Sequence, residues 1–248
     1  MARVERLWGL IAVGALLSLM LVQMPASAVR WLLPAEAGVT GLSGTIWSGQ
    51  ALRGWWGAGD KTIMLGRVQW QFQPWRLFWS SPITVSTQWG AQQFDARLSY
   101  LPGARLRLTN INLNFDTQIL GALMPLYIGG GFSGRFTNID LEGGQLKRLA
   151  GKAILENAVW TAQSGDIPLG TYHLDIQSNQ VDDEVVGAMK TLGGALQLTG
   201  DVVVRSGSYQ IDLQATGPVA LDDSFRGAVA MLATPTSEGF EISLEGTY

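Results

Sequence analysis

The sequence predicts a mainly β protein that begins with one apolar helix, and three observations lead to this prediction. Apolar and polar residues alternate with a period of two over many short segments, as they do in half-buried strands. Glycine is abundant, with 31 residues, and recurs between these segments, where it permits tight turns. A stretch without charged residues precedes the first segment. With 248 residues, the chain can form one large antiparallel domain with a sizeable core.

The N-terminal stretch predicts a membrane anchor. Residues 7–29 contain no charged side chain, and this stretch is long enough to cross a bilayer as a helix. Because the positive flank comes first, we expect residues 1–6 to be a cytoplasmic tail, 7–29 a transmembrane anchor and 30–248 a periplasmic domain. The alternative is a cleaved signal peptide, since Ala26-Ser27-Ala28 is typical of a cleavage site, and whether residues 1–28 are cleaved stays open at this stage.

The alternation is clearest in the segments RVQWQFQPW and ITVSTQW, at 67–75 and 83–89. Each places its apolar residues on one face and its glutamines, serines and threonines on the other. Later segments up to 240–248 repeat the pattern. If this face is not covered, it forms an apolar groove, for which we expect as lining residues Val68, Trp70, Phe72, Val85 and Trp89.

Short glycine-containing links between the segments predict antiparallel neighbours, and the segments number roughly a dozen. Two stretches differ from the rest. Residues 116–131 have apolar residues at helical spacing behind a capping Asp116, which predicts a short helix or an apolar loop joining two halves of the sheet. Residues 178–194 are the candidate for a second short helix or a long loop. The pattern fits an open curved sheet or, as the alternative, a closed β-sandwich.

Composition excludes several function classes. The net charge is −3 and no cluster of cations occurs, so nucleic-acid binding is not expected. The chain has no cysteine and a single histidine, His173, which does not suffice for the common zinc sites. No nucleophile elbow or calcium-loop spacing occurs. We therefore predict no catalytic residues, no cofactor, no metal and no enzymatic activity.

The stretch GLSGTIWSGQALRG, residues 41–54, is rich in glycine but lacks the Gly-Lys-Ser/Thr ending of a phosphate-binding loop. Together with a Val-x-Trp strand and a Pro-Trp-x-Leu element, it resembles protein N of the bacterial type II secretion system. The residues that carry this resemblance are Gly41, Gly44, Trp47, Gly49, Val68, Trp70, Pro74, Trp75 and Leu77. The resemblance implies a non-enzymatic accessory component in the inner membrane, with other type II secretion components as partners and a role in export of folded proteins across the outer membrane.

A looser, fold-level resemblance is to periplasmic proteins of the AsmA and TamB type. It implies an elongated, curved sheet, a half-pipe with an apolar groove, and hence an alternative function as a periplasmic lipid-binding or lipid-transfer protein with phospholipid as ligand. A third and weaker hypothesis is an outer-membrane barrel, because the last strand ends on an aromatic residue, Tyr248. The long N-terminal helix and the short strands count against it.

Overall fold

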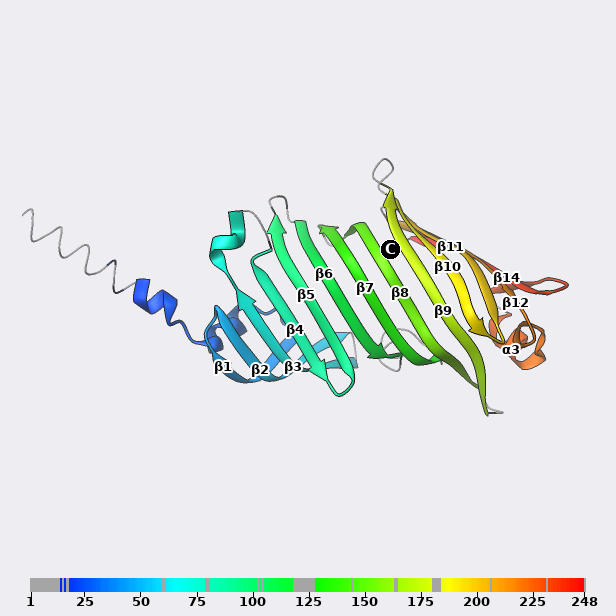
Figure 1. Cartoon of the computed structure of the whole chain (residues 1–248), viewed down its shortest axis with the longest axis horizontal. Coiled ribbons are helices and arrows are strands. Elements are labelled where there is room, and N and C mark those ends of the chain that lie inside the picture. The colour runs from blue at the N-terminus through cyan, green and yellow to red at the C-terminus, as the bar shows by residue number, and fades with distance from the viewer. Residues whose placement is uncertain are drawn as a thin grey trace, which may run out of the picture.

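In the computed structural model, fourteen strands form one continuous antiparallel sheet (Figure 1). The structure describes residues 14, 16, 18–58, 61–78, 81–101, 103, 105–117, 128–143, 145–162, 165–179, 184–205, 207–230 and 232–247, with only the backbone described at 58, 61, 77, 78, 162, 224 and 228. The strands succeed one another along the long axis of the molecule, from blue to red in Figure 1. The predictions of a mainly β fold and of antiparallel neighbours are confirmed.

The strands are longest in the middle of the sheet. They are β1 (Ala37–Gly44), β2 (Ser48–Ala58), β3 (Lys61–Phe72), β4 (Ile83–Trp89), β5 (Gln92–Leu101), β6 (Arg105–Asp116), β7 (Ile128–Glu142), β8 (Gln145–Ala162), β9 (Gly165–Asn179), β10 (Glu184–Gly194), β11 (Gln197–Arg205), β12 (Ser208–Thr216), β13 (Ala233–Pro235) and β14 (Gly239–Thr247). Each strand from β1 to β11 pairs with the next in sequence.

The exception is the C-terminal end, where β14 inserts between β12 and β13. The sheet is open, with β1 at one end and β13 at the other. The alternative of a closed β-sandwich is therefore wrong, because the described strands form one sheet rather than two layers. Strand alternation alone does not decide between these folds, since both bury one face of every strand.

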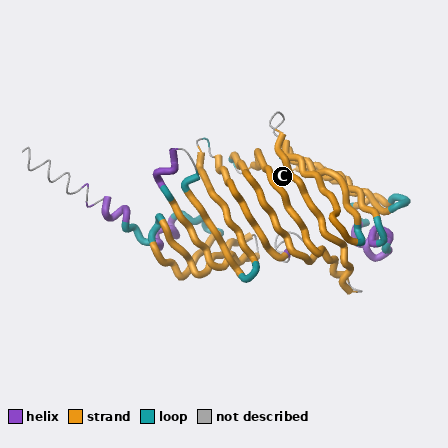
Figure 2. Tube along the Cα trace, in the orientation of Figure 1, coloured by secondary structure: helices purple, strands orange, loops and turns teal. Residues whose placement is uncertain are grey.

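Short helices lie at the two ends of the sheet, as Figure 2 shows. They are η1 (Ala26–Trp31), η2 (Pro74–Phe78), η4 (Val219–Leu221) and α3 (Asp223–Val229). The helix or apolar loop expected within 116–131 falls mainly on residues outside the described part of the chain. The strands on its two sides, β6 and β7, pair directly from Asp116↔Gly131 to Arg105↔Glu142, so the sheet runs on without a break.

The expectation of a helix or loop over 178–194 is wrong. Most of the segment forms the end of β9 and the whole of β10, and residues 180–183 lie outside the described residues. β10 pairs with β9 on one side and with β11 on the other. Its buried residues Val185 and Gly187 stand two positions apart, as a strand requires. Pairing on both sides outweighs the weak local preference of this segment.

Part of the expected membrane anchor, residues 7–13, 15 and 17, also lies outside the described residues. Among the residues described, no helix combines the length and the apolar character needed to cross a bilayer. The last part of the expected span is not a continuation of such a helix. Residues Ala26–Trp31 form η1, in which Ala26 and Ala28 are buried.

Two clusters of buried side chains form the core, both on the apolar side of the sheet. The central cluster lies on β5 to β10 around Ile111, which is 1% exposed, and Phe136. The second cluster lies at the C-terminal end, where Val219 and Phe225 of the short helices pack on the strands. Because one face of a single sheet is otherwise open, burial in the central cluster means that apolar side chains shield one another. Such shielding is expected on the inner side of a curved sheet.

Candidate functional site

The apolar face is continuous from one end of the sheet to the other. One register row crosses all fourteen strands without a charged side chain. It consists of Leu42, Ala51, Val68, Thr87, Phe94, Leu113, Gly134, Ala153, Leu174, Met189, Gly200, Leu213, Ile242 and Ala233, each paired with the next. In a regular sheet, side chains in one register row point to the same face. Along this row the strands therefore present a largely apolar face, interrupted by one hydroxyl, that of Thr87.

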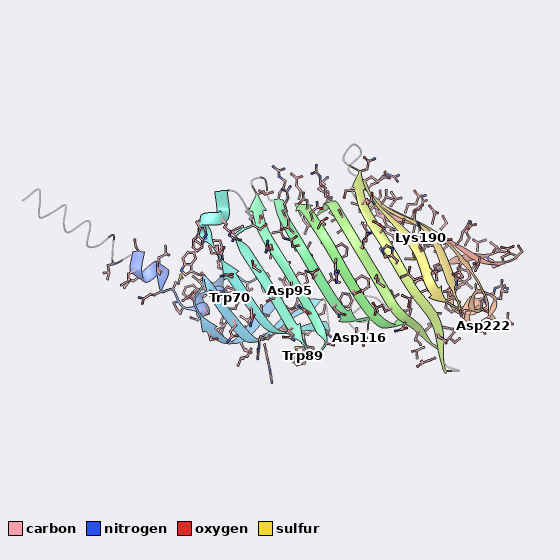
Figure 3. All side chains as sticks on the ribbon, viewed as in Figure 1. Trp70, Trp89, Asp95, Asp116, Lys190 and Asp222 are labelled. Carbon is pink, nitrogen blue, oxygen red and sulfur yellow. The ribbon has the colours of Figure 1, made fainter. Side chains whose placement is uncertain are left out.

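The structure brings four of the five expected groove residues together. Val68, Trp70 and Phe72 lie on β3, and Val85 of β4 is the register partner of Trp70. All four side chains are half-buried. Trp89 has the same parity but lies at the far end of β4 and is 48% exposed, so it stands at the margin of the cluster. Figure 3 labels Trp70 and Trp89 at these two positions.

The set of groove residues expected from the sequence was incomplete, because the same face of the sheet continues beyond β4. The half-buried side chains of Phe94, Leu113 and Leu174 follow Val68 along the register row. Their alternation was visible in the sequence. What the sequence did not show was the register that aligns the segments into one surface.

The C-terminal end of this face is covered, which the sequence did not predict. Phe225 of α3 is 6% exposed and packs edge-to-face on Trp160, with ring centroids 5.1 Å apart, and against Phe240 at 5.8 Å. The helix begins where the Asp222 carboxylate accepts a hydrogen bond of 3.0 Å from the Phe225 backbone N–H. An aspartate before a helical turn is a capping signal, and it is the one signal in the sequence that could have indicated this helix.

The glycines of the family motif have a structural role. Gly44 ends β1 with φ of +91°, a left-handed conformation, and a Cβ there would lie 2.5 Å from the Ser48 carbonyl oxygen. A Cβ on Gly49 would lie 2.5 Å from the Trp70 ring. Gly41 has φ of +68°. The stretch is therefore a tight β1–β2 connection that accepts Trp70 beside its backbone, in agreement with the interpretation that it is not a phosphate loop.

Trp47 of the same connection reaches both the sheet and the N-terminal segment. Its ring stacks on Phe72 at 5.5 Å, and its indole Nε1–H donates a hydrogen bond of 2.9 Å to the Leu21 carbonyl. The Ile46 N–H donates to the Met24 carbonyl at 3.0 Å. We call these contacts, with the Pro25↔Thr45 bridge, the N-terminal clamp.

The remaining motif residues lie just after β3. Pro74 and Trp75 begin η2, and the Trp75 side chain is 61% exposed. The side chain of Leu77 lies outside the described part of the chain. The Trp70 indole N–H donates to the Ile46 carbonyl at 3.1 Å, which links the Val-x-Trp strand to the same connection. Trp47 and Trp70 of the motif thus meet at the β1–β2 connection, whereas Trp75 points to solvent.

Among the described residues, no group of three or more histidine, cysteine, aspartate or glutamate residues could hold a metal ion. His173 lies on β9, half-buried and opposite Lys190, on the face away from the apolar row. The absence of catalytic activity stays a prediction, since a missing cluster does not exclude a reaction.

Residues 35–243 match the model of the type II secretion system protein N family. The chain belongs to this family. The match begins just before β1 and ends within β14, so it covers β1 to β13 and the first half of β14. No curated protein and no solved structure matches the chain. Membership gives this secretion protein an accessory role in type II secretion, in association with other secretion components of the cell envelope.

Proposed function

We propose that this protein is a non-enzymatic accessory component of the type II secretion system that is anchored in the inner membrane. In this proposal residues 7–24 hold the chain in the membrane, and the sheet lies in the periplasm. The observation that carries the proposal is the family match over residues 35–243, which include nearly all of the sheet. The charge-free N-terminal stretch supports the anchor, and the clamp supports an uncleaved chain, because Ala26 and Ala28 are buried against the domain.

The role in secretion is tested by deleting the gene and measuring export of type II substrates together with assembly of the other secretion components. We expect reduced export or incomplete assembly, restored by the full chain. Unchanged export with unchanged assembly would contradict the proposal. A chain that lacks residues 7–20 and carries a cleavable signal peptide is the matched control, since it removes most of the anchor and keeps Leu21 and Met24 of the clamp on the same sheet.

The anchor is tested on the full chain by alkaline extraction of membranes and by the mass of the purified protein. We expect the chain to stay in the membrane pellet with residues 1–28 attached. A mass that corresponds to cleavage after Ala28 would overturn the anchor and leave the secretion role standing.

A second function is compatible with the first, and the continuous apolar face favours it. We propose that phospholipid acyl chains cover the part of this face that α3 and η4 leave open. The half-buried Val68, Trp70, Phe72 and Val85 would contact the lipid near the N-terminal end. Large exposed apolar surfaces are rare in soluble domains, because contact with water is unfavourable.

Neighbouring positions on β4 give a matched test of lipid contact. A photo-crosslinking residue is introduced in place of Val85, on the apolar face, or of Thr84, on the opposite face. Cells with radiolabelled phospholipid are irradiated, and the label on the purified full chain is counted. We expect label from position 85 and little from position 84. Equal labelling at the two positions would contradict a lipid-filled groove.

A further inference from the structure

Charge is unevenly distributed along the sheet. Residues 1–152 contain 14 lysines and arginines and 7 aspartates and glutamates, whereas residues 153–248 contain 3 and 13. The net charge is therefore +7 in the first part and −10 in the second. Since the strands follow the sequence along the long axis, the molecule has a basic N-terminal region and an acidic C-terminal end (Figure 1).

The acidic end has a polar face on β11, β12 and β14. Asp201 stands opposite Asp212, and Glu245 stands opposite Gln210. Neutral groups solvate these carboxylates: the Ser243 hydroxyl donates to Asp212 at 2.7 Å, and the Gln210 amide donates to it at 2.7 Å. Neither β12 nor β14 contains a lysine or arginine. The one cation of β11, Arg205, stands at the end of that strand and forms an ion pair of 2.6 Å with Glu184 of β10, so β12 and β14 keep a negatively charged polar face.

A hollow of about 560 Å³ lies on this face. Its lining side chains come from three adjacent strands and include Thr199, Asp212, Gln214, Glu241 and Ser243.

The edge of β14 is only partly covered. β13 pairs with Phe240, Glu241 and Ile242, and no described strand pairs with residues 243–247 on that side. The Thr236 N–H donates to the Gly239 carbonyl, and backbone groups of successive residues point to opposite sides of a strand. The backbone groups of Ser243, Glu245 and Thr247 therefore face outward beyond the end of β13. Such an edge is a template for another strand.

The opposite end of the sheet is a poorer template. Gly41 in the middle of β1 has a left-handed φ of +68° and is skipped in the register with β2, between the pairs Thr40↔Arg53 and Leu42↔Ala51. An irregular edge strand is one of the ways in which proteins prevent addition of further strands.

We propose that the edge of β14 from Ser243 to Thr247 binds an extended, lysine- or arginine-rich segment of a partner protein as an additional strand. The added strand would hydrogen-bond to the outward backbone groups, as in other strand-addition complexes. Its alternate side chains would lie beside Leu244 on the apolar face and beside Ser243 and Glu245 on the polar face, beyond the residues that already pair with β13. Opposite charges on one face of neighbouring strands are favourable, which selects basic residues at the second set of positions.

The negative charge of this end of the sheet argues against a second copy of the chain or a membrane surface as the partner of the β14 edge. A second copy that added its own β14 would bring glutamates beside glutamates, and like charges in facing strands are destabilising. A membrane surface carries anionic headgroups and would be repelled by this end. The basic partner segment is the occupant that both the charge and the open backbone favour, and it does not depend on the proposed lipid ligand.

The test uses the full chain in nanodiscs of zwitterionic lipid and a labelled probe peptide, Lys-Val-Lys-Val-Lys-Val-Lys, with binding measured by fluorescence anisotropy at low salt. The control peptide, Lys-Pro-Lys-Val-Lys-Pro-Lys, has the same charge but cannot form a regular ladder. We expect the probe to bind at least tenfold more tightly than the control peptide. Equal binding of the two peptides would overturn strand addition.

Two pairs of variants separate the backbone from the charge. Ser243→Pro and Ser243→Ala both remove the hydrogen bond to Asp212, but only the proline also removes the outward N–H. We expect Ser243→Pro to weaken probe binding at least tenfold relative to Ser243→Ala, with thermal unfolding used to show that both fold. Glu245→Lys should weaken binding about fivefold relative to Glu156→Lys, an equal charge change on β8, as expected for an exposed charge pair.

Three results would overturn the proposal: equal binding by the two Ser243 variants, equal binding by the two lysine variants, or a dimer of the full chain that Ser243→Pro dissociates. The last result would assign the edge to a second copy. None of these results bears on export by the deletion strain, so a failure here is distinguishable from a failure of the proposed secretion role.

Discussion

The two ends of the apolar face differ in what covers them. At the C-terminal end, Phe225 of α3 and Val219 of η4 pack on the strands and are 6% and 8% exposed. At the N-terminal end, on β2 to β4, Val68 and Trp70 are only half-buried, and Trp89 is 48% exposed. Both ends are built from the same alternation of apolar and polar residues.

This comparison shows that alternation of apolar and polar residues defines an apolar face of the sheet but does not by itself make that face a buried core. A strand face becomes a core where a helix covers it, as at the C-terminal end, or where side chains of neighbouring strands shield one another, as in the central cluster. The described helices that pack into a buried cluster, η4 and α3, do so at one end only. Stability is therefore expected to be concentrated at the C-terminal end, and binding of an apolar ligand is expected at the open end.

The largest effect is expected from Phe225→Ala. The substitution removes the buried ring that contacts Trp160 and Phe240, and the free energy of unfolding should fall by about 3–5 kcal/mol, as for other buried aromatic truncations. Urea unfolding followed by tryptophan fluorescence measures this change. Trp89→Ala at the open end is the matched control and should cost less than about 1 kcal/mol. Equal losses from the two variants would contradict the difference between the two ends.

A substitution of glycine tests whether the open end depends on its backbone turn. Gly44→Ala places a side chain at φ of +91° and 2.5 Å from a carbonyl oxygen, so we expect a loss of about 1–3 kcal/mol in the free energy of unfolding. Gly131→Ala is the control, because a Cβ there meets nothing within 4 Å. It should change stability by less than about 1 kcal/mol. If Gly44→Ala were as mild as Gly131→Ala, the turn would not hold this end together.

Tyr172, beneath the covered end, links stability to pH. Its hydroxyl donates a hydrogen bond of 3.0 Å to the Leu196 carbonyl, and burial raises the pKa of Tyr172 from 10 to about 12. The folded state thus favours the neutral phenol. The resulting stabilisation is fully present below pH 10 and is lost as the pH rises from 10 to about 12.

Tyr172→Phe should remove this part of the pH dependence and should cost about 1–2 kcal/mol at neutral pH, because the Leu196 carbonyl loses its partner. Unfolding at several pH values between 8 and 11 measures both effects, with Tyr209→Phe as the control for a more exposed tyrosine. An unchanged slope in the Tyr172 variant would show that burial of this phenol does not control stability.

Features of the fold that depend on residues close together in the sequence could be predicted, whereas features that depend on distant residues could not. Strands and their faces were predictable, because a period of two is a local property of segments such as 67–73. The packing of α3 over the apolar face was not predictable, since a helix of seven residues is too short to show a helical period. Its capping residue, Asp222, was the one local signal for it. The family motif identified Trp47 and its glycines by resemblance alone. Its contact with Leu21 joins positions 26 residues apart in unlike elements, which no local pattern encodes.

The smallest effect is expected from Trp47→Phe, which removes the indole N–H of the N-terminal clamp but keeps a ring that can stack on Phe72. The loss of one hydrogen bond should cost about 0.5–1.5 kcal/mol. Because this bond joins the sheet to the N-terminal segment, faster amide hydrogen exchange should appear at Met24–Ala28 and at Ile46 while the C-terminal core stays unchanged. Phe94→Leu, a mild change on the same face away from the clamp, serves as the control. Faster exchange throughout the sheet would mean that the clamp supports the whole fold. Faster exchange confined to the segment would mean that the clamp sets how the sheet is held relative to the N-terminal segment.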